Sequence, residues 1–187
     1  MSEPGAGPAS LPALAARAQL GDRSALEALL RRLQPPLLDH ILGIVRDDDA
    51  GADVLQDVLI IICRRLGTVR EVAWVRAWAY RIATREAVRA IRRSRRRQGV
   101  SLDDMPDIAD TIADGAAIED EALLAALPGQ LAALPMAAQV ALRMHYLQAL
   151  TQQEIAEALE IPLGTVKSRL AYGLMWLRRS WTPPRNG

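Results

Sequence analysis

The sequence is poor in the residues that build covalent and metal-bound frameworks. It has one cysteine, two histidines and no phenylalanine. Cys63 has no internal disulfide partner, and together with His40 and His145 it provides no zinc ligand set with suitable spacing. These shortages exclude a disulfide-rich secreted module and a zinc module. We expect no metal and no other cofactor, and we expect Cys63, which lies beside Ile61 and Ile62, to be an inert buried thiol.

Long apolar runs and catalytic motifs are also missing. No stretch of about 18 apolar residues is present, and the N-terminal MSEPGAGPAS lacks a basic region followed by an apolar core. We therefore expect no membrane insertion, no signal peptide and a cytoplasmic location. The sequence has no glycine-rich phosphate loop, nucleophile elbow or catalytically spaced carboxylate pair, so we expect a protein that is not an enzyme.

The residues that are abundant favour helices. Half of the chain is apolar, alanine and leucine dominate, and β-branched residues do not alternate along the sequence. This pattern predicts an all-α protein. The net charge is only +1, but the charges are separated: residues 85–97 hold seven arginines and one acid, whereas residues 101–121 hold eight acids and no base.

Local signals predict several helices in the first half. We expect residues 1–10, which are rich in proline and glycine, to be disordered, and a helix over about 11–20. A second helix is predicted to begin at Ser24, because Ser24 and Glu27 have capping-box spacing. Pro35 and Pro36 should break or kink it. The run from Asp47 to Gly51 is predicted to be a turn.

Two longer helices should follow. Leu55, Val58 and Ile62 recur at the spacing of one buried helix face. A long helix is predicted from near Glu71 into the arginine cluster, with Trp78 inside the core. Further along, its arginines share one sector and few have an acid at i±4, so a solvated face is one reading and a polyanionic partner is the other. The stripe is formed by Arg81, Arg85, Arg89, Arg92, Arg93 and Arg96.

The remaining sequence predicts a second small helical domain. Residues 98–117 are acidic and aperiodic, which predicts a flexible linker, and residues 118–181 carry short helical patterns with a tail at 182–187. Thr151 and Glu154 form another capping box, and a turn through Glu160 leads to a further helix. This arrangement is typical of a helix-turn-helix that reads DNA, although an ordinary helical hairpin is the alternative. The candidate DNA contacts are Thr165, Lys167, Ser168, Arg169 and Tyr172.

Both halves resemble one family. The segment 131–135, the triplet Glu154-Ile-Ala and the run from Ile161 to Arg169 closely resemble the promoter-reading domain of bacterial sigma factors of the extracytoplasmic-function (ECF) group. The segment 53–58 resembles the polymerase-binding helix of that group, and 77–83 resembles its promoter-melting helix. The resemblance covers about residues 22–179.

The resemblance implies an initiation factor in which residues 11–97 form sigma region 2 and residues 118–181 form sigma region 4. It implies core RNA polymerase and promoter DNA as partners, with a bound anti-sigma factor as a further partner and no homo-oligomer. The implied polymerase contacts are Asp53, Gln56, Asp57 and Val58. The implied minus-ten contacts are Arg70, Tyr80, Arg81, Arg85, Arg89, Arg92 and Arg93. The implied minus-thirty-five contacts are Thr165, Val166, Lys167, Ser168, Arg169 and Tyr172.

The sequence departs from the family pattern at several positions. Arg85 and Arg89 stand where the family often has Asn and Asp, and Glu160 replaces a common glycine in the turn. Tyr172-Gly173 takes the place of a frequent Arg-Ala pair. Two other functions stay open at this stage: a stand-alone helix-turn-helix regulator, and a polymerase-binding protein that does not read promoters. The first half of the chain separates a sigma factor from a stand-alone regulator, since a regulator needs no polymerase-docking helix. Selective transcription from promoters would exclude the polymerase-binding protein that does not read them.

Overall fold

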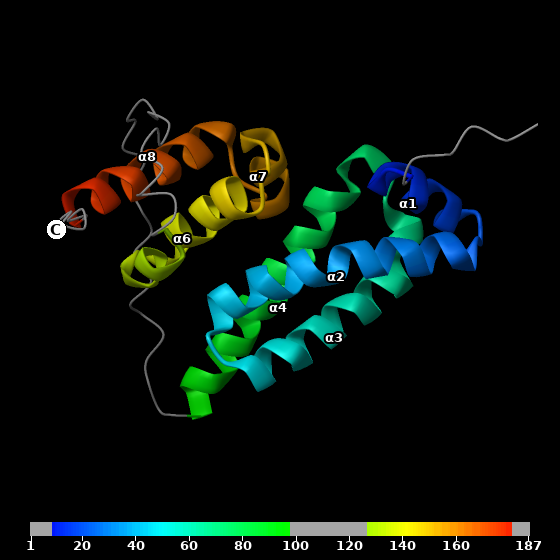
Figure 1. Ribbon diagram of the computed structural model, residues 1–187, viewed down its shortest axis with the longest axis horizontal. Coiled ribbons are helices and arrows are strands. Elements are labelled where there is room, and N and C mark those ends of the chain that lie inside the picture. The colour runs from blue at the N-terminus through cyan, green and yellow to red at the C-terminus, as the bar shows by residue number, and fades with distance from the viewer. Residues whose placement is uncertain (1–8, 98–126, 181–187) are drawn as a thin grey trace, which may run out of the picture. The chain divides into compact units, whose positions relative to one another are not determined.

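The computed structural model describes residues 9–97 and 127–180, and within these ranges all regular elements are helical, as the composition predicted (Figure 1). The chain divides into two compact units, Met1–Ile91 and Arg92–Gly187. The predicted linker at 98–117, the first residues of the predicted second domain (118–126), the tail at 182–187 and nearly all of the predicted disordered N-terminus lie outside the described residues.

The first unit is a bundle built on one long helix. Its elements are α1 (Leu11–Gln19), α2 (Arg23–Val45), α3 (Asp48–Arg65), the 3-10 turns η1 (Leu66–Thr68) and η2 (Val72–Trp74), and most of α4 (Val75–Arg97). The boundary between the units falls within α4, after Ile91. Helices α1 and α3 both pack against α2, and Figure 1 shows α3 running alongside it. The core is lined by Leu29, Leu33, Leu37, Ile41, Val58, Ile62 and Ala83. Burial of Val58 and Ile62 confirms the predicted inner face of α3.

The start of α2 differs from the prediction. The N-cap is Asp22, whose Oδ1 accepts a hydrogen bond of 3.0 Å from the Ala25 amide, while the Ser24 hydroxyl donates to the same oxygen at 2.7 Å. The predicted Ser24 capping box is therefore wrong by two residues. The Ala25 amide, then Ser24 and Arg17, hold the pKa of Asp22 well below its usual range. This cap is complete above the ordinary carboxyl pKa and weakens as the pH falls towards the lowered value.

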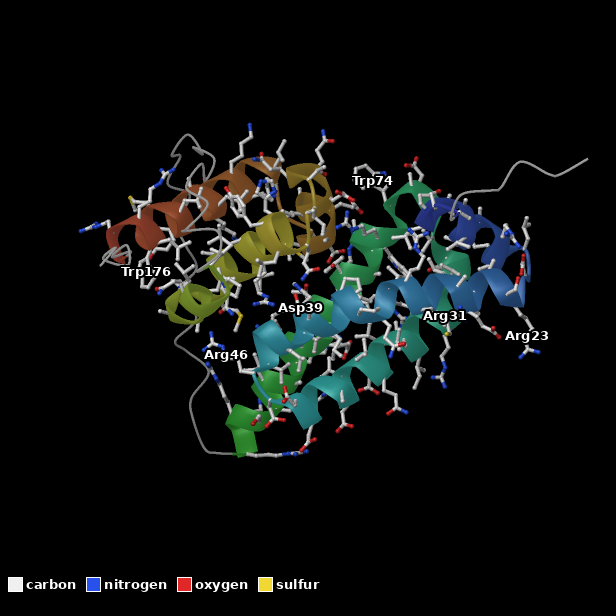
Figure 2. The ribbon with its side chains drawn as sticks, in the orientation of Figure 1. Arg23, Arg31, Asp39, Arg46, Trp74 and Trp176 are labelled. Atoms are coloured by element: carbon white, nitrogen blue, oxygen red, sulfur yellow. The ribbon has the colours of Figure 1, made fainter. Side chains whose placement is uncertain are left out.

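Of the predicted break or kink at the two prolines, the break does not occur, since α2 continues through Pro35 and Pro36. Each proline removes the amide donor for the carbonyl four residues earlier, and those carbonyls belong to Arg31 and Arg32, which are exposed. Water can satisfy them, and Figure 2 shows the Arg31 side chain on the outside of α2. The buried face of the same turns carries leucines that hold the helix in place.

The run of aspartates is the beginning of α3 and not a turn. Asp47 is the N-cap and accepts a 2.8 Å hydrogen bond from the Ala50 amide, and Asp48 and Asp49 lie in the first turn. Carboxylates are favourable there because the exposed amides and the helix dipole attract negative charge. The chain reverses one residue earlier, at Arg46, which adopts a left-handed conformation with φ 59°.

Helix α4 is attached to α2 by a buried polar contact. His40 is fully buried, its Nε2 lies 2.9 Å from Thr84 Oγ1, and its ring meets the Tyr80 ring edge-on at 5.1 Å. The Thr84 hydroxyl donates to the Tyr80 carbonyl, so His40 Nε2 acts as the donor to Thr84.

Two predictions about burial fail: Trp78 is only half-buried, and Cys63 is exposed.

The second unit contains the predicted helix-turn-helix. Residues 127–130 are helical, and the following elements are η3 (Leu131–Ala133), α6 (Met136–Leu142), the π-helical turn η4 (Arg143–Leu147), α7 (Gln152–Leu159) and α8 (Leu163–Ser180). Helix α8 packs against α6 and α7. The core includes Leu131, Leu142, Met144, Leu150, Ile155, Val166, Leu170 and Leu174.

The two ends of α7 follow the sequence. The Glu154 amide donates to Thr151 Oγ1 at 3.1 Å, and the Thr151 amide donates to Glu154 Oε2 at 2.8 Å, so the capping box is confirmed. Helix α7 ends at Glu160, which is left-handed with φ 55° and ψ 43°. Glycine avoids the steric cost of this conformation because it has no Cβ.

The helix α8 glycines differ in their surroundings. A Cβ added at Gly173 would lie 2.5 Å from Leu142 Cδ1 and 3.2 Å from Leu142 Cγ, whereas one added at Gly164 would meet nothing within 4 Å. Leu142 is fully buried and has little room to shift. Gly173 therefore sets how closely α8 approaches α6.

Replacing Glu160 with glycine should stabilise the second unit. We expect Glu160→Gly to relieve about 1 kcal/mol of left-handed strain and to raise the melting temperature by a few degrees. Circular dichroism thermal scans measure this change. Glu160→Ala is the control, because it removes the side chain but keeps the Cβ. A glycine variant that melts no higher than the alanine variant would count against strain at this residue.

Replacing Gly173 with alanine should destabilise the same unit. Alanine favours helix by up to about 1 kcal/mol over glycine, but overpacking against buried Leu142 costs roughly 1–3 kcal/mol. We expect Gly173→Ala to lower the melting temperature, while Gly164→Ala leaves it unchanged or raises it. Equal melting temperatures for the two variants would show that the Leu142 side chain can shift without loss of stability.

Candidate polymerase and promoter interfaces

The outer face of α3 presents the residues assigned to polymerase contact. Asp53, Gln56 and Asp57 are exposed and lie one turn apart on the same side of the helix. Val58 is fully buried in the core, so its predicted contact role is corrected to a packing role. The periodicity had placed Val58 on the inner face, and the burial agrees with that pattern.

An open groove of about 610 Å³ lies beside these polar residues, between α2 and α3. Its lining is predominantly apolar, and Gln56 and Arg64 are among the polar residues that contribute to it. The apolar part includes Leu38, Leu55, Leu59, Ile60 and Cys63. Ile60 keeps 40% of its surface exposed, which is unusual for isoleucine on a helix. Apolar surface flanked by carboxylates can bury against a partner that supplies apolar and basic side chains.

The loop between α3 and α4 consists of two tight turns around Arg70. The Val69 amide donates to the Leu66 carbonyl at 3.1 Å, and the Trp74 amide donates to the Glu71 carbonyl at 3.0 Å. Arg70 lies between these turns and is exposed. The loop is therefore a short, internally hydrogen-bonded segment that exposes the positively charged Arg70 side chain.

The arginine stripe on α4 is largely accessible. Arg85, Arg89, Arg92 and Arg93 are exposed, and Arg81 is half-buried. Arg89 Nη1 lies 2.5 Å from Glu86 Oε1, so this arginine of the stripe has an intrahelical partner. The i+3 spacing was the signal for this pair.

Tyr80 belongs to the core and not to the DNA-facing surface. It is 1% exposed and its ring contacts His40. The predicted minus-ten contact at Tyr80 is therefore corrected, because a buried ring cannot reach a nucleic acid. The next residue, Arg81, keeps part of its side chain accessible and can reach a nucleic acid.

Two tryptophans near the start of α4 keep part of their surface accessible. Trp74 and Trp78 are half-buried, and the Trp74 Nε1–H donates to Glu71 Oε2 at 3.1 Å. Figure 2 shows Trp74 at the turn that precedes α4. Indole faces of this kind can stack on bases. Spacing of i, i+4 is the same for a core stripe and for a stacking surface, so the sequence could not distinguish them.

The start of α8 presents a smaller set of polar side chains than predicted. Lys167 is exposed, and Thr165, Arg169 and Tyr172 are half-buried. Val166 is fully buried and Ser168 is 6% exposed, so both are corrected to packing positions. The helix begins at Leu163, and Gly164 is exposed in its first turn.

Among residues 9–97 and 127–180, no cluster of three His, Cys, Asp or Glu side chains could hold a metal ion. No helix of the same ranges combines the length and apolarity needed to cross a membrane.

Family models match both halves of the chain. Residues 29–97 match sigma-70 region 2, and residues 124–177 match sigma-70 region 4. The first match includes α3, the loop and α4, and the second includes α7 and α8. A stand-alone regulator would account for the second match but not for the first.

Curated relatives carry the same description over most of the chain. The RNA polymerase sigma-H factor of Pseudomonas aeruginosa is 30% identical over 169 residues, covering 84% of this chain and 86% of the relative. The ECF RNA polymerase sigma factor SigM of Mycobacterium tuberculosis is 32% identical over 152 residues, covering 81% of this chain and 74% of the relative.

Solved structures show the same fold. CnrH, solved in complex with the cytosolic domain of CnrY, aligns with a TM-score of 0.66 at 19% identity over 90% of this chain and 94% of that chain. The sigma factor RpoE of Bartonella quintana, solved with the anti-sigma factor NepR, aligns with a TM-score of 0.61 at 18% identity over 80% of this chain and 92% of that chain.

Sigma factors of this family bind core RNA polymerase and promoter DNA, and they direct initiation without being catalytic enzymes themselves. The matches to regions 2 and 4, together with relatives that span most of the chain, assign that role here. The chain belongs to the extracytoplasmic-function group of RNA polymerase sigma factors and is a promoter-specificity subunit.

Proposed function

We propose that the exposed face of α3 and the groove beside it form the docking surface for core polymerase. Asp53, Gln56 and Asp57 present acceptors and negative charge next to an apolar channel that contains half-exposed Ile60. This juxtaposition is the observation that carries the proposal. The carboxylates would steer a basic partner helix into place, and the apolar channel would supply the affinity.

We propose that the loop and α4 hold the opened minus-ten element. Arg70 would contact the strand from the loop, Trp74 and Trp78 would offer faces for unstacked bases, and the arginine stripe would neutralise backbone phosphates. Unstacking a base costs a few kcal/mol, which these contacts have to offset. Arg81, Arg85, Arg89, Arg92 and Arg93 form the proposed phosphate-binding set.

We propose that α8 reads the minus-thirty-five element through its first turns. Lys167 is the most accessible cation, and Thr165, Arg169 and Tyr172 keep enough surface to reach phosphates or base edges. The buried side chains of Val166 and Ser168 pack against the core and so hold α8 in place. The small accessible set favours modest affinity for this element.

The same surfaces suit an inhibitory partner. The groove and the exposed side chains of Leu163 and Met175 on α8 leave apolar area uncovered in the described residues. The Bartonella quintana neighbour was solved with an anti-sigma factor. We propose that a partner of that kind competes with polymerase for this chain, which would act in the cytoplasm as a monomer or heterodimer.

Run-off transcription with purified bacterial core polymerase and a promoter-fragment library tests the function. We expect transcripts that start downstream of a shared two-block motif, only when this protein is present. Asp57→Arg should reduce core affinity about thirtyfold, as expected for a central interface residue, and should abolish those transcripts. Pull-down on core polymerase measures the first effect.

Glu27→Arg is the matched control for that variant. Glu27 is exposed on α2 and lies outside the groove lining, so the same change of charge should leave core binding intact. Equal retention of both variants by core polymerase would mean that docking uses another surface.

The arginine stripe should be visible in the salt dependence of DNA binding. Each phosphate contact to a single strand contributes roughly 0.7 to the slope of log affinity against log salt, so Arg92→Ala should reduce the slope by about that amount. Arg89→Ala should reduce it less, because Arg89 already shares its charge with Glu86. Titration of the holoenzyme with single-stranded minus-ten DNA at several salt concentrations provides both slopes. Unchanged slopes for Arg92→Ala would remove the stripe from the interface.

A further inference from the structure

Gln19 connects α1 to the loop proposed to face the promoter. Its side-chain Nε2 donates two hydrogen bonds, at 2.9 Å to the Leu66 carbonyl and at 2.8 Å to the Val69 carbonyl. The acceptors lie 47 and 50 residues away in the sequence. Both hydrogens of the amide are therefore used on one short turn of a distant segment.

The two bonds control the part of the loop that precedes Arg70. The Leu66 carbonyl also accepts the Val69 amide at 3.1 Å, so Gln19 completes its second acceptor position. The Val69 carbonyl and the Arg70 amide belong to one planar peptide group. Holding that carbonyl fixes the plane of the peptide, and this plane sets the direction in which Arg70 leaves the backbone.

The position is exposed, which separates it from core packing. Gln19 is the last residue of α1, its side chain is exposed, and Leu20 beside it is 89% exposed. Polar residues at such positions usually remain in water. The Gln19 amide donates both of its hydrogens to loop carbonyls, and the side chain buries little apolar area. Its role is therefore to hold the loop conformation and not to fill the core.

We infer that Gln19 is a positioning residue for promoter recognition: it holds the loop before Arg70 in the conformation that discriminates the minus-ten bases. This inference rests on the proposed function of the loop. Gln19 itself would not touch DNA. Its effect would pass through the Val69–Arg70 peptide to the side chain that does.

Gln19→Met tests the inference, because methionine keeps the length of the side chain and removes both donors. The matched control is Glu27→Met at an exposed position of α2 outside the groove. Each variant is assembled with core polymerase, and its affinity is measured for single-stranded minus-ten oligonucleotides whose sequence comes from the run-off library. The readout is the ratio of affinities for the preferred base and for each substituted base.

We expect Gln19→Met to lower this ratio by about tenfold at one or two adjacent positions, while core binding and the melting temperature stay close to those of the wild type. Hydrogen exchange of the peptide covering residues 66–71 should become faster. The control variant should match the wild type in every assay.

Three results would overturn the inference. An unchanged base ratio together with a lowered melting temperature would make Gln19 a purely structural residue. Loss of core binding would show an effect on the whole unit, and unchanged loop exchange would show that the loop does not need the contact. A wild-type holoenzyme without base preference in this element would overturn the proposed loop function itself, which is distinct from failure of the variant alone.

Discussion

Unbroken continuation of α2 is the constraint on which the first unit depends. Helices α1 and α3 pack on it, and α4 contacts it through His40. Two prolines interrupt its hydrogen bonding, but the carbonyls that lose donors are on the solvent side. The buried leucines of the opposite face then keep the helix together. A break at this point would separate the α3 docking face from α4, because both are placed by the same helix.

Each proposed interface is a compromise between packing and exposure. On α3, Val58 belongs to the core, while Asp53, Gln56 and Asp57, all within five residues of it, face outward. On α8, Val166 and Ser168 seat the helix and Lys167 projects between them. The alternation follows from helix geometry, since adjacent residues differ by about 100°. Contiguous motif residues therefore divide into those that hold a helix and those that can reach a partner.

The second unit shows local strain and close packing at its recognition helix. Left-handed Glu160 ends α7, and Gly173 lets α8 approach buried Leu142. Both features determine how α8 is oriented against the rest of the unit. The family pattern has glycine at the first of these positions and alanine at the second, so this chain differs at two points that control one helix.

The sequence by itself determined the helical fold class, the family and the capping box at Thr151, because these depend on composition, motif and local hydrogen bonding. It also predicted a turn through Glu160, but the left-handed conformation of that residue came from the structure. Tertiary structure decided which motif residues are accessible: Tyr80 turned inward to His40, while Cys63 and the two tryptophans stayed at least partly exposed. Helical spacing shows which residues share one face of a helix, but it does not show whether another element covers that face. The contact of Gln19 with the loop also came only from the fold, since its acceptors are backbone carbonyls of a distant segment and leave no pattern in the side-chain sequence.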